Sequence, residues 1–156
     1  MKLSKSGVAI VAASALSSVL LGPGTAGATT QATNRLANYT SQQCMASGTA
    51  GNLYATACLP ILRLKQWVWS GTTNRDTKIT NAGTALCLDS NPAGDVFSLR
   101  CNGTDNQLWK AIQYEVNGTV LLQNVEHRRC IVQNARGFYD TVACDRYSLP
   151  QRWNIG

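Results

Sequence analysis

Histidine is almost absent from this 156-residue chain, and charged residues make up only 14% of it. His127 is the sole histidine, and no Cys-x-x-Cys pair occurs, so neither a zinc site nor a Ser-His-Asp or Cys-His catalytic set can be assembled. The eight Asp and Glu residues are scattered, and no pair of them can be nominated for glycoside hydrolysis. We therefore expect a protein that is not an enzyme and that uses no metal or cofactor.

Long apolar runs are also missing. A helix needs about 20 apolar residues to cross a bilayer, and the run from Val8 to Leu21 has only 14. This run follows a basic start and precedes the small residues at 26–28, which is the order of a secretory signal peptide. We expect residues 1–28 to be a signal peptide cleaved after Ala28, with the protein secreted to the extracellular space and no membrane span.

Charge is present but is not clustered. The 14 Lys and Arg and 8 Asp and Glu residues give a net charge of +6, and removal of Lys2 and Lys5 with the signal peptide leaves +4. No basic run is longer than Arg128-Arg129, whereas nucleic-acid-binding proteins usually carry a clustered basic surface. We expect no nucleic-acid partner.

The chain repeats itself with a period of 43 residues. Seven columns keep this step: Leu36, Ile79, Leu122; Asn38, Asn81, Asn124; Cys44, Cys87, Cys130; Gly51, Gly94, Gly137; Leu53, Val96, Tyr139; Cys58, Cys101, Cys144; and, with a shift of one residue, Trp67, Trp109, Trp153. Three units, at about 29–70, 71–113 and 114–156, account for the whole expected mature domain, residues 29–156.

Each unit has the pattern of short β-strands. No stretch of the mature chain carries a 3.6-residue apolar period, turn signals recur about every ten residues, and Asn117-Gly118 lies between two alternating apolar runs, as in a type I′ hairpin. About four strands per unit predict an all-β fold of about twelve strands that closes on itself to hide its edges. A β-trefoil meets these conditions, whereas a three-bladed propeller is disfavoured because propellers usually need four or more blades.

Six cysteines in an exported chain indicate disulfides. Two simple pairings treat the units alike: Cys44–Cys58, Cys87–Cys101 and Cys130–Cys144 within units, or bridges between neighbouring units. We favour one disulfide per repeat, since each would close a loop of about 15 residues, worth about 3 kcal/mol in the chain-entropy model.

The middle unit contains Cys87-Leu88-Asp89 and Asn106-Gln107-Leu108-Trp109, and the third ends in Gln151-Arg152-Trp153. With these CLD and QxW motifs the mature chain resembles the ricin B-type lectin family of QxW β-trefoils, similar to carbohydrate-binding module family 13. In the first unit Lys65 replaces the glutamine of QxW. The tryptophans are expected in the core and the glutamines close to backbone groups.

The resemblance implies one partial sugar site, in the middle unit. Asp89 stands at the family's carboxylate position, Asn106 at its amide position and Gln107 at the QxW glutamine, whereas Leu99 occupies the place of the usual aromatic residue. Phe97 shares a strand face with Leu99 and could offer a displaced stacking surface.

The first and third units lack this set. Ala46 and Val132 stand in place of the aspartate, and Thr56 and Val142 in place of the aromatic residue, although Asp140 lies close by in the third unit. We expect these two units to act as scaffold.

These observations favour a secreted, non-catalytic, lectin-like protein that binds a glycan or polysaccharide. The alternative is a protein-binding adaptor or receptor-binding subunit of a secreted assembly such as a toxin, with Phe97, Leu99, Phe138 and Tyr139 exposed beside turns and another secreted protein as partner. A third hypothesis is a protease inhibitor that presents the stretch 127–129 as bait.

Overall fold

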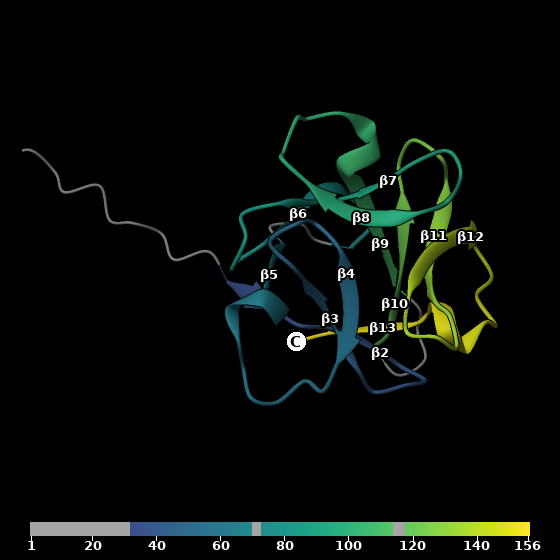
Figure 1. The fold of residues 1–156 in the computed structure, drawn as a ribbon. Helices are drawn as coiled ribbons and strands as arrows, with labels where there is room; N and C mark the ends of the chain where they lie inside the picture. The colour runs from purple at the N-terminus through teal and green to yellow at the C-terminus, as the bar shows by residue number, and fades with distance from the viewer. Residues whose placement is uncertain (1–31, 70–72, 114–117) are drawn as a thin grey trace, which may run out of the picture.

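The computed structural model describes residues 32–69, 73–113 and 118–156, so the expected signal peptide lies outside the described residues. Within these ranges the chain forms thirteen strands and three short 3-10 helices, and no α-helix (Figure 1). The elements are β1 (Thr33–Asn34), β2 (Leu36–Asn38), β3 (Cys44–Ser47), β4 (Leu53–Thr56), η1 (Arg63–Lys65), β5 (Trp67–Trp69), β6 (Asp76–Asn81), β7 (Cys87–Ser90), β8 (Val96–Leu99), η2 (Asp105–Gln107), β9 (Leu108–Gln113), β10 (Val120–Asn124), β11 (Arg129–Gln133), β12 (Tyr139–Ala143), η3 (Leu149–Gln151) and β13 (Trp153–Ile155).

The expected four strands per unit are present in the second unit (β6 to β9) and in the third (β10 to β13). The first unit has five because Arg35 interrupts its first strand: Arg35 exchanges backbone hydrogen bonds with Gly156, at 2.6 and 3.2 Å. As a result β1 pairs with β5, whereas β2 pairs with β13.

The sheet does not close into a barrel, contrary to the expectation from the sequence. Its hydrogen-bonded path runs β1-β5-β6-β9-β10-β13-β2-β3-β4, with β7–β8 and β11–β12 as side hairpins. β1 stands at one end of this path and β2 lies close to the other end. Arg35 connects the two strands covalently, and strand pairing changes from β5 to β13 across this residue.

The tryptophan that recurs in each repeat has the same role in the core. Trp67, Trp109 and Trp153 are each 0% exposed. Each indole Nε1 donates a hydrogen bond to the backbone carbonyl of the residue after its unit's first cysteine; the acceptors are Met45 (2.9 Å), Leu88 (2.9 Å) and Ile131 (3.3 Å). Thus each tryptophan removes a large apolar area from water while its one polar group stays paired.

The three buried asparagines link the repeats in a cycle. Each side-chain Nδ2 donates to the backbone carbonyl of the residue before the QxW position in the preceding repeat: Asn38 to Pro150 (2.7 Å), Asn81 to Leu64 (2.8 Å) and Asn124 to Asn106 (2.8 Å). Because the first repeat is tied to the third, these bonds close the pseudo-three-fold arrangement that the strand ladder leaves open.

The predicted turns and disulfides are present. Gly51, Gly94 and Gly137 have φ values of 87°, 105° and 79°, a region that favours glycine. Three disulfides link residues 44 to 58, 87 to 101 and 130 to 144, so the pairing within units is confirmed and the pairing between units is wrong. The strands that flank the expected hairpin, β9 and β10, pair antiparallel; most of the turn itself, 114–117, lies outside the described residues.

Candidate functional site

The predicted residues of the middle repeat come from β7, β8 and η2. Asp89 on β7 lies directly opposite Phe97 on β8, and Cys87 lies opposite Leu99. Since residues two apart on a strand, and residues opposite each other across an antiparallel pair, share one face, Asp89, Phe97 and Leu99 point to the same side of this hairpin. Phe97 is half-buried and Leu99 is 48% exposed, so an apolar rim lies beside the carboxylate.

The Asp89 carboxylate is buried and held by the glutamine of QxW. Asp89 is 3% exposed, and its Oδ2 accepts a hydrogen bond of 2.9 Å from Gln107 Nε2. Gln107 also donates to the backbone carbonyl of Arg100 (3.1 Å) and accepts from the Asn102 amide (2.8 Å). The other carboxylate oxygen, Oδ1, makes no hydrogen bond within the described residues, so Asp89 keeps an acceptor that a ligand hydroxyl could use.

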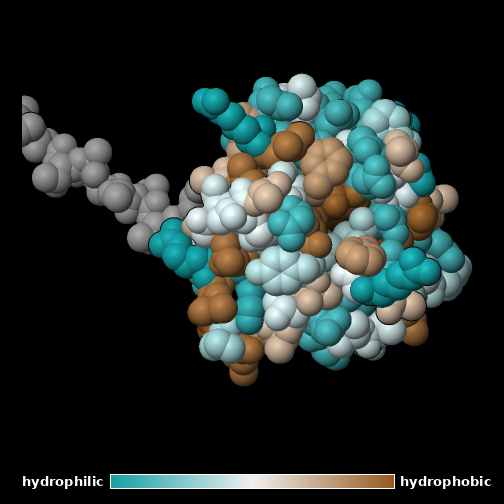
Figure 2. Space-filling model, viewed as in Figure 1, coloured by the Kyte–Doolittle hydropathy of each residue, from teal (hydrophilic) through white to brown (hydrophobic). Residues whose placement is uncertain are grey.

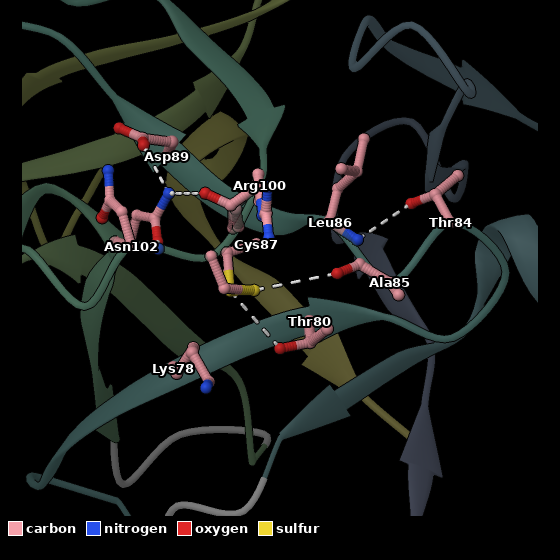
Figure 3. The surroundings of a disulfide bond; sticks show 12 residues. Lys78, Thr80, Thr84, Ala85, Leu86, Cys87, Asp89, Arg100 and Asn102 are labelled. Carbon is pink, nitrogen blue, oxygen red and sulfur yellow. Dashed lines mark hydrogen bonds between the residues drawn. A yellow bond between two sulfur atoms is a disulfide. The ribbon is translucent and has the colours of Figure 1, made fainter.

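The disulfide of the middle repeat fixes this arrangement. It joins Cys87, at the start of the strand that carries Asp89, to Cys101, which adjoins both residues whose backbone groups bond to Gln107 (Figure 3). In the close-up Asp89, Arg100 and Asn102 gather near the disulfide, with dashed lines converging on the amide that bridges them (Figure 3). The carboxylate is therefore positioned by a short covalent loop and a neutral donor.

Asn106 lies in η2 immediately before Gln107 and is half-buried. Its backbone carbonyl accepts the bond from Asn124 of the next repeat, whereas its side-chain amide makes no hydrogen bond within the described part of the chain. The backbone of Asn106 is thus held in place, while its side-chain amide remains able to donate and accept hydrogen bonds.

In the other two repeats, the residue at the glutamine position of QxW hydrogen-bonds to backbone groups and, within the described residues, to no side chain. Gln151 Nε2 donates to the carbonyl of Ala143 (3.0 Å), and its Oε1 accepts from the Asp145 amide (2.9 Å). Lys65, which is 6% exposed, donates from Nζ to the carbonyls of Ala57 (2.8 Å) and Pro60 (3.0 Å). The lysine keeps one of the glutamine's donor functions, which explains why this repeat retains the fold without the motif.

Among the described residues of the first and third repeats, no carboxylate bonds the residue at the glutamine position of QxW. Ala46 faces Tyr54 across β3 and β4, and Val132 faces Asp140 across β11 and β12. Asp140 accepts a hydrogen bond of 2.9 Å from Asn134 Nδ2 within its own turn. Its carboxylate therefore belongs to the turn and does not reproduce the Asp89–Gln107 pair.

Of the four apolar residues predicted to be exposed beside turns, three are exposed or half-buried and one is buried. Leu99 and Phe138 are exposed (48% and 59%), and Phe97 is half-buried. The prediction for Tyr139 is wrong: it is 4% exposed, and its ring lies 5.8 Å, centroid to centroid, from that of Trp153 in the core. Tyr139 occupies the column of Leu53, whose side chain is also buried.

Sequence reasoning missed the exposed apolar segment before η1. Leu59, Ile61 and Leu62 are 67%, 57% and 51% exposed. The stretch 127–129, suggested as protease bait, does not form a loop over its whole length, because its last residue, Arg129, is part of β11 and pairs with Ala143. Among the described residues, no group of three or more His, Cys, Asp or Glu could hold a metal ion, and no helix is long and apolar enough to cross a membrane.

Comparison with known proteins agrees with this architecture. The model of the family described as ricin-type beta-trefoil lectin domain-like matches residues 64–143. No curated protein matches the chain. Among solved structures, the designed three-fold symmetric protein ThreeFoil is similar at a TM-score of 0.70 and 15% identity, over 79% of this chain and 96% of that one.

Two further solved structures are similar at the level of the fold. SeviL, solved with the asialo-GM1 saccharide, has a TM-score of 0.66 and 15% identity over 81% of this chain and 98% of its own. An exo-β-1,3-galactanase from Clostridium thermocellum has a TM-score of 0.69 and 17% identity over 79% of this chain, which spans only 29% of that enzyme.

Proposed function

The chain belongs to the ricin-type β-trefoil lectin domain-like family, and on that premise we propose that it is a secreted, non-catalytic carbohydrate-binding protein that holds one sugar at Asp89 of its middle repeat. The solved structure of SeviL with a saccharide supports the idea that this fold can carry a sugar site. The similarity to the galactanase covers only a part of that enzyme, so it is compatible with a binding module that acts beside a separate catalytic domain.

A single observation carries the assignment to Asp89: the residue is 3% exposed, yet within the described residues only one of its carboxylate oxygens is hydrogen-bonded, by Gln107. The second oxygen, Oδ1, is not among the described side-chain atoms that are both buried and without a partner, so it is open to solvent and can accept a hydrogen bond from a ligand. A hydroxyl of a sugar ring would supply such a donor, and the half-buried Phe97 would offer an apolar face to the ring's C–H groups. The side-chain amide of Asn106, which has no partner within the described residues, is the nominated orienting group.

Isothermal titration with galactose-, xylose- and mannose-type sugars, guided by a glycan array, tests this function. Asp89→Asn removes the charge and turns one acceptor into a donor, so the dissociation constant should rise about 5-fold to 150-fold, as expected for about 1 to 3 kcal/mol of lost hydrogen bonding. Asp95→Asn is the matched control, because Asp95 is an exposed aspartate immediately before the neighbouring strand, β8. Equal affinity of the Asp89 and Asp95 variants would reject the assigned site.

Secretion is tested separately. Expression of the full chain in a secreting bacterial host should release a mature protein whose first residue is Thr29, as read by N-terminal sequencing. Recovery of the chain only inside the cells, with Met1 retained, would contradict this part of the proposal.

One observation favours a second candidate function, binding of another secreted protein. Leu59, Ile61 and Leu62 form a continuous exposed apolar segment (67%, 57% and 51%), and Figure 2 shows hydrophobic side chains at the lower left of the molecule, where Figure 1 draws the segment between β4 and η1. Exposed apolar surface of this kind often marks an interface. Copurification of a defined partner from culture medium that is lost in the triple Leu59→Ser, Ile61→Ser, Leu62→Ser variant would support it; a monomer without a partner would count against it.

A further inference from the structure

A cavity of about 300 Å³ lies where the third repeat meets the first, and none of its lining residues belongs to the middle repeat. Its walls are the turn 38–43 of the first repeat and the turn 133–137 of the third, with Pro150 beside them. We infer that this junction cavity is a second binding site, separate from Asp89, for a neutral sugar. The inference rests on the proposed carbohydrate-binding function and extends it to a place that the family motifs do not predict.

The cavity presents neutral hydrogen-bonding groups. Gln133, which is 8% exposed, donates from Nε2 to Gln43 Oε1 (3.1 Å), and its Oε1 accepts from Ser41 Oγ (2.6 Å). Each amide oxygen has two lone pairs and each amide nitrogen two hydrogens, so both glutamines retain capacity toward a ligand. The Nε2 of Gln43 makes no hydrogen bond within the described residues.

This chemistry favours a sugar over a charged ligand. No Lys, Arg, Asp or Glu lines the cavity, so nothing there would neutralise an ionised group. Sugar hydroxyls both donate and accept, which matches the amides and the hydroxyls of Thr40 and Ser41. Pro150 and Ala135 add apolar surface against which the C–H side of a sugar ring can pack.

Both walls of the cavity are held in place before any ligand arrives. The Oδ1 of Asn38 accepts hydrogen bonds from the amides of Thr40 and Ser41 (3.0 and 3.2 Å), while its Nδ2 holds the Pro150 carbonyl. On the other wall, the Oδ1 of Asn134 accepts from the amides of Arg136 and Phe138, at 3.0 Å each. Preorganised walls reduce the entropy that a ligand would otherwise lose in ordering them.

The two equivalent junctions differ in the residue at the position of Gln43. Between the first and second repeats this position is Leu86, whose Cδ1 lies 3.9 Å from the place where a Cβ would stand on Gly51. Between the second and third it is Arg129, whose guanidinium lies 3.1 Å from the same place on Gly94. At Gly137, among the described residues, only the Cβ of Ala55 lies within 4 Å of that place, at 3.5 Å. Gln43 therefore does not approach the glycine as Leu86 and Arg129 do; its side chain instead bonds to Gln133.

The junction cavity is also distinct from the third repeat's version of the family site. That position is Val132, the equivalent of Asp89, and successive residues of a strand point to opposite faces. Gln133, which reaches the cavity, therefore lies on the other side of β11 from Val132. Loss of the aspartate in the third repeat does not affect the cavity.

Nuclear magnetic resonance can test the cavity directly. The side-chain amide signals of Gln43 and Gln133 are followed in ¹⁵N-labelled protein during titration with methyl β-galactoside, methyl β-xyloside and methyl α-mannoside. At least one sugar should shift both signals saturably, in the wild type and equally in Asp89→Asn. Gln43→Leu, which copies Leu86 of the second repeat, and Gln133→Ser, which copies Ser47 and Ser90, should each weaken binding at the cavity at least tenfold.

The possible results separate this inference from the proposed function. Shifts confined to the surroundings of Asp89 would overturn the junction site and leave the proposed function in place. Unchanged affinity in both variants, read from the glutamine signal that each retains (Gln133 in Gln43→Leu, Gln43 in Gln133→Ser), would also overturn it, because binding would not depend on the amides. No shift of any signal with any of the three sugars would remove the inference together with the function on which it rests.

Discussion

Replacement of Asn81 by leucine tests the links between repeats. Asn81 is 0% exposed; its Nδ2 donates to the Leu64 carbonyl (2.8 Å), and its Oδ1 accepts from the amides of Gly83 (3.0 Å) and Thr84 (3.1 Å). Leucine has nearly the same shape, so the change removes these bonds without opening a large cavity. It leaves a carbonyl in one repeat and a turn in the next without their shared partner.

The loss of stability in Asn81→Leu depends on how many backbone groups lose their hydrogen-bond partner at places that water reaches poorly. Gly83 is exposed, so water can replace its lost hydrogen bond, whereas Leu64 and Thr84 are both half-buried. A buried group left unsatisfied costs about 1 to 3 kcal/mol, and partial access to water lowers that figure. Two such groups therefore predict a loss of about 2 to 4 kcal/mol in the free energy of unfolding.

Urea unfolding at 25 °C with the disulfides intact measures this loss, because a single domain of this size is expected to unfold in one cooperative step. Asn52→Leu is the control: Asn52 is exposed and makes no side-chain hydrogen bond within the described residues, so its variant should stay within about 0.5 kcal/mol of the wild type. If Asn81→Leu costs less than about 1 kcal/mol, the asparagines do not join the repeats as argued.

Three further predictions concern the core and the turns. Burial raises the pKa of Tyr139 far above its usual range, so above about pH 10 the unfolded chain loses this proton first and the free energy of unfolding falls as the pH rises; Tyr139→Phe should flatten this fall between about pH 10 and 12 in urea unfolding. Serine at both Cys87 and Cys101 should cost about 3 kcal/mol in urea unfolding, and no loss would show that the loop does not constrain the unfolded chain. Gly94→Ala, where a Cβ would lie 3.0 Å from a backbone oxygen, should lower the melting temperature more than Gly118→Ala, where nothing lies within 4 Å; equal effects would refute the steric argument.

The 43-residue period accounts for the success of the fold prediction. A column such as Leu36, Ile79 and Leu122 can stay apolar in three copies only if each copy meets the same environment, and all three are 0% exposed. The same reasoning reduced the simple disulfide pairings to two, and loop closure favoured the pairing within units, which the structure confirms. Periodicity therefore predicts what the repeats share.

Features of a single place in the fold could not be predicted in this way. The split of the first strand depends on Arg35 meeting Gly156, 121 residues further along the chain. The contact between Ser41 and Gln133 spans 92 residues and joins different columns. Proximity to a turn predicts exposure for Tyr139, whereas the aliphatic residues in its column, Leu53 and Val96, indicate the burial that the structure shows.

Divergence among the repeats is concentrated where it costs the fold little. The tryptophans and asparagines that agree in all three copies bond to backbone carbonyls, so a change at these positions would leave buried groups without partners. Asp89, in contrast, corresponds to Ala46 and Val132, and Gln43 to Leu86 and Arg129, without a change in the strand arrangement. Since such residues can change without unfolding the domain, one backbone can present a carboxylate in one repeat and an amide-lined cavity at a junction of two others, and each can be altered by mutation independently of the rest.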